Sequence, residues 1–195
     1  MKSTVYRTFA GACLLALAAC GGSDPSALAD DAASSDADPP SGVAAGDSPS
    51  DALPVSEQVA RIEQRLAATN SRDWDSWQAL HTPDAVRTAP ELEQPLEGSA
   101  AMRAAIETLS TAFPDYHLEL RQAFGQGEWL AVRLHTTGTM TGPLVLSDGT
   151  SVPATGQPID QDWAALVRFQ GDRISEFHEF YDQLLLMVQL GLVAP

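Results

Sequence analysis

The sequence predicts an α+β domain in which helices come first and an antiparallel sheet follows. Apolar residues recur at helical spacing between residues 56 and 112, and they alternate with polar residues between residues 116 and 181. Glycine-containing turns separate the alternating segments, which is typical of hairpin-connected strands. Helices that precede a run of strands are expected to pack together on one face of the resulting sheet.

Three helices are predicted before the sheet. Ser56 and Asp73 can cap the first two, and Ser99 begins the third. The second is expected to end at residues 81–84 and the third at residues 113–115, because each of these segments contains a proline. The apolar residues expected to face the core are Val59, Ile62 and Leu66 in the first helix, Trp74, Trp77 and Leu80 in the second, and Met102, Ile106 and Leu109 in the third.

Four strands are predicted after the helices. They cover residues 116–124, 129–139, 159–169 and 173–181. Residues 140–157 contain three glycines and two prolines and are expected to be mostly loop. Leu184, Leu185 and Val188 predict a short closing helix that ends at Gly191.

The first twenty residues have the pattern of an export signal. Lys2 and Arg7 precede an apolar run, Phe9 to Ala19, and small residues stand directly before Cys20. The run is too short for a membrane-spanning helix. The arrangement resembles a bacterial lipoprotein signal, which implies removal of residues 1–19 and a lipid on Cys20. The alternative is an ordinary signal peptide in which Cys20 has no role.

The same resemblance implies a place in the cell envelope, with the chain anchored on the periplasmic side. Gly21 favours the outer membrane, because aspartate at that position is the usual inner-membrane retention signal in some bacteria. Residues 21–54 contain seven aspartates and no basic or aromatic residue, so residues 20–54 are predicted to be a disordered acidic tether. A poorly patterned helix is the alternative. The folded domain is expected to span residues 55–195.

Charge and residue usage exclude several classes of function. The chain has a formal net charge of −15, which argues against nucleic acid and anionic membrane surfaces as partners. Lys2 is its one lysine, and Cys13 and Cys20 are its two cysteines, so the mature domain has no Schiff-base lysine and no free thiol. The four histidines lie in separate predicted elements and no glycine-rich phosphate loop occurs, so neither a metal nor a cofactor is expected.

Several short strings, taken in order, carry a family resemblance. The strings are Phe113-Pro114-Asp115, Val132-Arg133 leading to Gly138-Thr139-Met140-Thr141-Gly142, Ala154-Thr155-Gly156-Gln157, Ile174-x-Glu176-x-His178-x-x-x-Asp182, and Gln189-Leu190-Gly191. Together they resemble the SnoaL-like (polyketide cyclase or ester cyclase) family of the nuclear-transport-factor-2-like fold.

The resemblance implies a cone-shaped, curved antiparallel sheet wrapped around the N-terminal helices, with a pocket at the open end. It also implies acid–base ring closure without metal or cofactor, a small hydrophobic molecule as the ligand and, in many members, a homodimer formed through the sheet. The family's acid/base aspartate, at the end of the last strand, falls on Asp182.

The last predicted strand carries the main candidate site. Glu176, His178, Phe180 and Asp182 alternate and therefore share one face. If that face lines the pocket, burial equips Asp182 as the catalytic base, and His178 and Glu176 contact the substrate. His178 and Asp182 lie roughly 13 Å apart along a strand, too far for a direct hydrogen bond. The alternative is that Asp182 caps the final helix and Glu176 faces an arginine.

Further substrate-binding candidates come from the middle strands. Arg133 and His135 share a face of the second strand with Thr137 and Thr139, and so polar a row is either solvent-facing or a pocket wall. Arg133 could hold an anionic or carbonyl oxygen of a ligand. Trp163, on the third strand, could face either way.

Three functional hypotheses stay open at this point. The first is a membrane-tethered enzyme that performs cyclase-like or isomerase-like acid–base catalysis on a carbonyl compound. The second is a non-catalytic ligand-binding lipoprotein, because Met140 stands where the family string often has a histidine. The third is an envelope interaction module that binds a protein partner through the outer face of the sheet.

Overall fold

The computed structural model describes residues 52–146 and 149–194. The predicted signal peptide, Cys20 and residues 21–51 of the predicted tether lie outside the described residues. Among the helices that are described, none combines the length and the apolar character needed to cross a bilayer.

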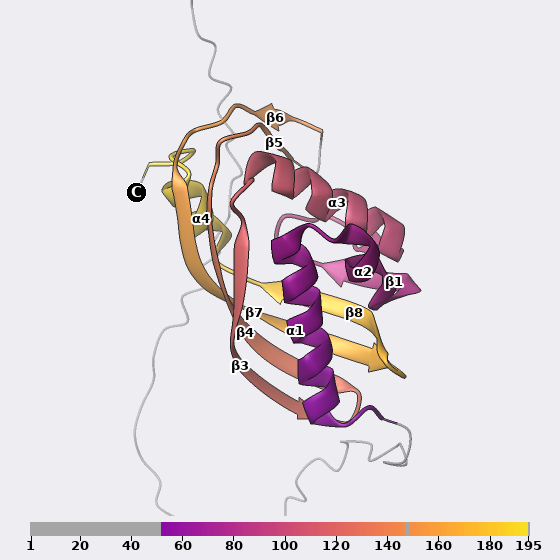
Figure 1. The fold of residues 1–195 in the computed structure, drawn as a ribbon. Helices are drawn as coiled ribbons and strands as arrows, with labels where there is room; N and C mark the ends of the chain where they lie inside the picture. The colour runs from indigo at the N-terminus through magenta and orange to yellow at the C-terminus, as the bar shows by residue number, and fades with distance from the viewer. Residues whose placement is uncertain (1–51, 147–148, 195) are drawn as a thin grey trace, which may run out of the picture. The chain divides into compact units, whose positions relative to one another are not determined.

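The described residues form a curved six-stranded sheet with helices packed against it (Figure 1). The strands lie in the order β2-β1-β8-β7-β4-β3, and neighbours are antiparallel except for β1 and β8, which run parallel. The α+β class and the curved sheet around N-terminal helices are thereby confirmed. The elements are α1 (Val55–Ser71), α2 (Trp74–Ala79), β1 (His81–Thr88), β2 (Leu96–Glu97), α3 (Ser99–Ala112), β3 (His117–Gln126), β4 (Trp129–Thr139), β5 (Leu144–Val145), β6 (Ser151–Val152), β7 (Pro158–Gln170), β8 (Arg173–Phe180) and α4 (Gln183–Gln189).

The two predicted helix caps have different outcomes. Helix α1 begins at Val55 and its N-cap residue is Pro54 rather than Ser56, because the N–H of Gln58 already donates to the carbonyl of Pro54 at 2.9 Å. The cap of α2 is confirmed, since the side chain of Asp73 accepts from the N–H of Ser76 at 3.1 Å.

Strand β1 corrects the prediction that residues 81–84 only end a helix. His81 pairs with Ile174 and Val86 pairs with Glu176, so residues 82–85 bulge opposite Ser175 alone. Such a bulge breaks the period-two pattern by which strands are recognised in a sequence. A proline inside the bulge, which has no N–H to donate to a ladder, obscures the strand further.

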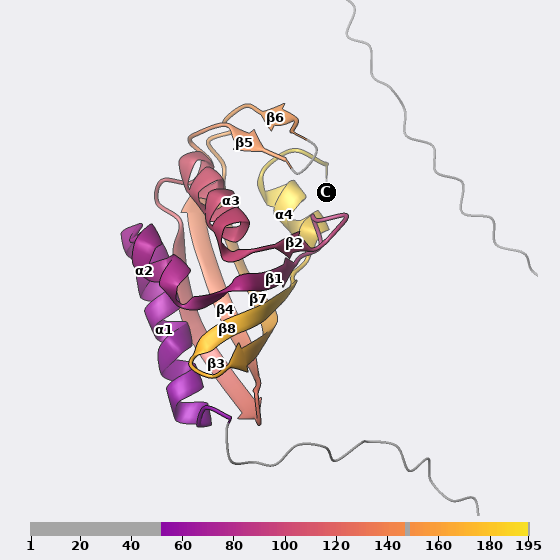
Figure 2. The same cartoon turned by 90° about the vertical axis from the view of Figure 1, so that its right-hand side faces the viewer.

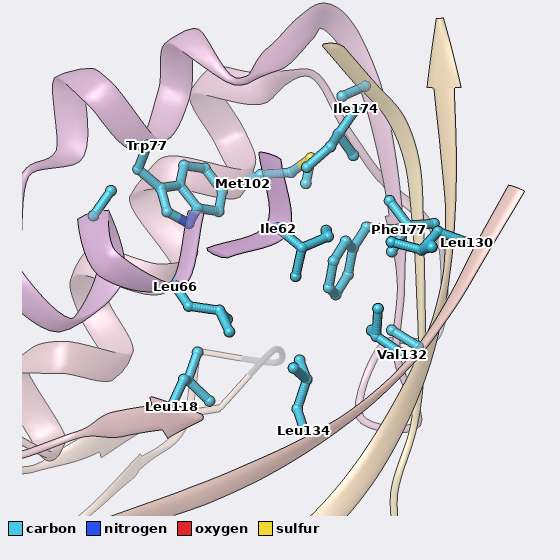
Figure 3. Packing of buried hydrophobic residues seen from close by; sticks show 14 of the residues in the cluster. Ile62, Leu66, Trp77, Met102, Leu118, Leu130, Val132, Leu134, Ile174 and Phe177 are labelled. Carbon is cyan, nitrogen blue, oxygen red and sulfur yellow. The ribbon is translucent and has the colours of Figure 1, made fainter. Parts of the chain in front are cut away.

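The main core lies between the helices and one face of the sheet. Helices α1, α2 and α3 all lie on that face (Figure 2). Figure 3 shows the apolar side chains of this core meeting between the two layers, where burial supplies most of the driving force for folding. The helices contribute Ile62, Leu66, Trp77 and Met102, and the sheet contributes Leu118, Leu130, Val132, Leu134, Ile174 and Phe177.

Alternation along the long strands gives the sheet a buried concave face and an exposed convex face. In β4 the even-numbered residues from 130 to 138 are buried, whereas in β7 the buried residues are odd-numbered. In β8, Phe177 is buried between the partly exposed Glu176 and His178. The parity of a residue therefore decides whether its side chain faces the helices or the outer surface.

Gly142 holds the segment after β4 against the end of α3. Its N–H donates to the carbonyl of Ala112 at 3.0 Å, and a Cβ at this position would overlap the carbonyl oxygen of Thr111. Only glycine permits so close an approach of two backbones, which explains this residue in the string that ends at Gly142.

Candidate functional site

Most of the predicted site residues lie on the convex face. Arg133 and His135 occupy odd-numbered positions of β4, where Arg133 is exposed and His135 partly exposed, and Glu176 and His178 flank the buried Phe177 in β8. Of the two placements that the sequence left open, the structure has the outward-facing one rather than the pocket wall, because alternation turns Phe177 toward the helices and its neighbours away from them. Their roles in substrate binding stay predictions.

Hydrogen bonds and ion pairs engage these convex side chains. His135 Nδ1 lies 2.8 Å from Asp162 Oδ1, and Arg133 Nε lies 3.7 Å from Asp162 Oδ2. Arg168 donates from Nη1 to Glu176 at 3.0 Å, so the alternative in which Glu176 faces an arginine is confirmed. On this face the charges are matched in pairs, mostly at partly exposed positions where each pair is worth little.

Asp182 and Trp163 are placed differently from the others. Asp182 is exposed, and its carboxylate accepts from the N–H of Leu185 at 2.9 Å, so it caps α4 as the alternative proposed. Its catalytic role stays a prediction. Trp163 lies on the concave face, where Nε1 donates to the Thr136 hydroxyl at 2.6 Å in a buried hydrogen bond.

The concave face holds a polar group that we call the concave cluster: Arg87, Glu91, Tyr116, Glu179 and Tyr181. Arg87 donates from Nε and Nη2 to the two carboxylate oxygens of Glu179, each at 2.7 Å. Nη2 also donates to Glu91 at 2.8 Å, and Glu91 accepts from the Tyr181 hydroxyl at 2.6 Å. The side chains of Arg87 and Glu179 are only 18% and 10% exposed, so this two-pronged ion pair is largely removed from water.

The environment of the concave cluster keeps its phenols protonated. Burial, and after it the negative charge of Glu179, raises the pKa of Tyr116 to about 12. Burial and the hydrogen bond to Glu91 raise the pKa of Tyr181 above its ordinary value. Burial opposes ionisation of Arg87, but the charge and hydrogen bonds of Glu179 outweigh it and raise the pKa of the guanidinium. The cluster thus contains two carboxylates, one guanidinium and two protonated phenols, of which Tyr181 already donates to Glu91.

Arg65 of α1 is a second buried cation, and it packs against rings. Its guanidinium carbon lies 4.0 Å from the ring centroid of Phe177 and 5.1 Å from that of Trp77. Its Nε donates to His81 Nε2 at 3.3 Å, and His81 Nδ1 donates to the Trp77 carbonyl at 2.9 Å. Because a carbonyl can only accept, this contact assigns the imidazole proton to Nδ1. Burial lowers the pKa of Arg65 to about 10, and burial together with the charge of Arg65 lowers that of His81 to about 3.

The sequence prediction misses the concave cluster for a specific reason. Arg87 and Glu91 belong to β1 and the segment after it, where no strand is predicted. Glu179 and Tyr181 lie on the predicted last strand, but on the face opposite to the chosen residues. Phe177 could have indicated them from the sequence. A large apolar residue at an odd-numbered position of this strand indicates that the odd-numbered residues, Glu179 and Tyr181 among them, face the core.

Two surface hollows stand out in the part of the chain that the structure describes. One, of about 360 Å³, is lined by Gln78, Ser99 and Arg103 among others, and the second, of about 420 Å³, includes Arg168 and Glu176. Neither hollow includes a residue of the concave cluster. Across residues 52–146 and 149–194, no three histidine, cysteine, aspartate or glutamate side chains gather as metal ligands.

The fold and the order of its elements match a known family. The family model for SnoaL-like polyketide cyclases matches residues 60–190, and the chain therefore belongs to this family. Membership of this family suggests a cyclase-like or isomerase-like function. No match was found among curated proteins.

Solved structures share the fold at low sequence identity. A proposed SnoaL-like polyketide cyclase from Jannaschia sp. CCS1 is 23% identical, with a TM-score of 0.63 over 73% of this chain and 96% of the other. TsrD from Streptomyces laurentii is 24% identical, with a TM-score of 0.62 over 72% and 99%. IdmH, a proposed polyketide cyclase from Streptomyces antibioticus, is 23% identical, with a TM-score of 0.57 over 68% and 97%. These likenesses show a common fold.

The buried neutral His81 predicts a specific loss of stability in acid. Its pKa is about 3 in the fold against an ordinary value of 6.5, so between these pH values the unfolded chain binds a proton that the folded chain does not. The free energy of unfolding therefore falls as pH falls through this window, by up to about 1.4 kcal/mol per pH unit from this group. In urea titrations, we expect His81→Gln to flatten the curve of unfolding free energy against pH.

The exposed His117 supplies the control, because its ring lies at the surface near Glu119. His117→Gln should follow the wild-type pH dependence. A His81→Gln curve that runs parallel to the wild-type curve would contradict the assignment of a buried neutral imidazole.

Proposed function

We propose that this protein is a cofactor-independent acid–base catalyst of the cyclase or isomerase type, which acts on a small hydrophobic carbonyl compound at the concave face of its sheet. The observation that carries the proposal is the concave cluster, in which a carboxylate lies beside protonated phenols. Trp163 and Phe177, whose ring centroids are 6.4 Å apart, are buried apolar residues on the same face. A carboxylate, hydroxyl donors and apolar walls are what proton abstraction next to a carbonyl requires.

The proposed chemistry divides the work between Glu179 and Tyr116. Glu179 takes the proton from the carbon next to the carbonyl, and its position is fixed by the two hydrogen bonds from Arg87. Tyr116, protonated because its pKa is about 12, donates to the carbonyl oxygen as negative charge develops there. The carbanion then attacks within the molecule or is reprotonated at another carbon, which gives ring closure or isomerisation.

Exchange of carbon-bound protons tests this assignment. The purified domain is incubated with small ketones such as cyclohexanone in deuterated buffer, and loss of the α-proton signal is followed by NMR. We expect the wild-type domain to accelerate exchange and Glu179→Gln to lose about a hundredfold of the acceleration. Tyr116→Phe, which keeps the carboxylate and the ring, should also slow exchange.

Asp182→Asn is the matched comparison, because it changes the carboxylate that the family resemblance selects. Since Asp182 caps α4 at an exposed position and asparagine caps helices about as well as aspartate, we expect this variant to retain both exchange and the closing helix. Exchange that disappears in Asp182→Asn and persists in Glu179→Gln would place the base at Asp182 and overturn the assignment.

A non-catalytic ligand-binding protein is the second candidate. It is favoured by the Arg87–Glu179 contact, in which both carboxylate oxygens already accept hydrogen bonds. It is also favoured by Met140, which is fully buried in a second apolar cluster and brings no proton donor to the position where the family often has histidine. Tight binding of a hydrophobic ketone without exchange or turnover would support this candidate.

We also propose that the mature chain is held at the cell envelope by a lipid on Cys20. Support comes from the charged start, the apolar run and the small residues before this cysteine. Cys20→Ser should abolish incorporation of labelled fatty acid and move the protein out of the membrane fraction. Cys13→Ser is the control and should keep the label, because Cys13 is removed with the signal. A membrane-bound, labelled Cys20→Ser protein would contradict the proposal.

A further inference from the structure

Three side chains on the convex face form a continuous hydrogen-bonded relay. The hydroxyl of Thr88 lies 2.9 Å from His178 Nδ1, and His178 Nε2 lies 2.9 Å from Glu176 Oε2. The backbone explains why they meet. Thr88 and His178 are register partners in the parallel β1–β8 pair, and Glu176 is two residues before His178 on the same strand face.

The chemistry of the partners fixes the direction of the relay. An ionised carboxylate can only accept, and hydrogen bonds from His178, the largest cause, and Arg168 hold the pKa of Glu176 below its ordinary value. A neutral His178 imidazole therefore carries its proton on Nε2 and presents the lone pair of Nδ1 to Thr88. The Thr88 hydroxyl in turn donates its proton toward that lone pair. This is the order of hydroxyl, imidazole and carboxylate that activates a nucleophile.

The relay is flanked by exposed apolar side chains. Trp129 stacks on the His178 ring at 6.1 Å between centroids, and Leu166 is the register partner of His178 on β7. Phe180, two residues further along β8, is 54% exposed, and Leu166 is 42% exposed. The hollow of about 420 Å³ adjoins the relay at Glu176. An apolar acyl or aryl group can therefore lie against the surface next to the hydroxyl.

We propose that Thr88, His178 and Glu176 form an acyl-transfer site for esters that carry an apolar group and a good leaving group. The Thr88 oxygen bonds to the ester carbonyl carbon while its proton passes to His178 Nδ1. The bond to the leaving oxygen then breaks, and that oxygen leaves with the proton from His178. Water attacks the acyl-threonine in the same way and releases the acid. No oxidant, reductant or cofactor enters this balance.

The proposal is restricted to good leaving groups for a structural reason. Arg168, the cation adjacent to the relay, is already paired with Glu128 at 3.0 Å and with Glu176 at 3.0 Å. Its charge is therefore engaged rather than free to stabilise a developing oxyanion. The site also differs from the concave cluster, since the two lie on opposite faces of β8, so failure of one leaves the other untouched.

p-Nitrophenyl butyrate tests the site with the mature chain. Release of p-nitrophenol is followed by absorbance, and the acylated residue is located by peptide mass spectrometry after acid quenching. We expect a butyryl group on Thr88 and a rate above that of buffer. His178→Gln should reduce the rate about a hundredfold, and Thr88→Val, which matches threonine in shape, should abolish both adduct and rate.

Two control variants distinguish loss of the catalytic groups from loss of folding. Thr88→Ser keeps the hydroxyl and should retain the adduct, while His117→Gln removes an exposed histidine outside the relay and should behave as wild type. Thermal unfolding is recorded for every variant. Absence of an adduct on Thr88, or a Thr88→Val protein that turns over as fast as wild type, would overturn the proposal.

Discussion

The concave side of this fold depends on the ion pair between Arg87 and Glu179. It joins β1 to β8, the parallel neighbours in the described sheet, just beyond the bulge at residues 82–85. Taking both charges out of water is costly, and the two short hydrogen bonds together with Glu91 offset that cost. The pair therefore fixes the place of a carboxylate on the concave face, and burial together with the charge of that carboxylate raises the pKa of Tyr116 and keeps it protonated.

The layered architecture could be predicted from the sequence because it follows from two periodicities. Apolar residues at helical spacing place α1 and α3 against the sheet, and the long strands β4 and β7 follow their alternating patterns almost to the residue. Strand β1 could not be predicted in the same way, because its pairing residues are separated by a bulge that contains Pro83. A bulge is stabilised by contacts with β8 and α3, which are distant in the sequence and carry no local signal.

The position of the candidate site could be predicted from the sequence only in part. Alternation correctly groups Glu176 with His178, but it does not say which of the two faces meets the helices. That choice is made by the larger apolar surface of Phe177, which packs beside Arg65 and Trp163. As a result, neighbouring residues of β8 belong to different groups on opposite faces of the sheet. Glu179 contacts Arg87 in the concave cluster, and His178 contacts Thr88 in the relay. Asp182 lies just beyond the strand, where the backbone needs a helix cap.

Arg87 and Glu179 form a buried pair on which the concave side of the fold depends, and a matched pair of arginine substitutions tests this dependence. Arg87 and Arg103 each contact two carboxylates, but Arg103 and its partners Asp75 and Glu107 lie at the surface. The free energy of unfolding should fall by about 3–5 kcal/mol in Arg87→Met, where Glu179 is left without its partner, and change little in Arg103→Met. Adding Glu179→Gln to Arg87→Met should recover part of the loss. Equal, small effects of the two arginine substitutions, or no recovery in the double variant, would contradict the account.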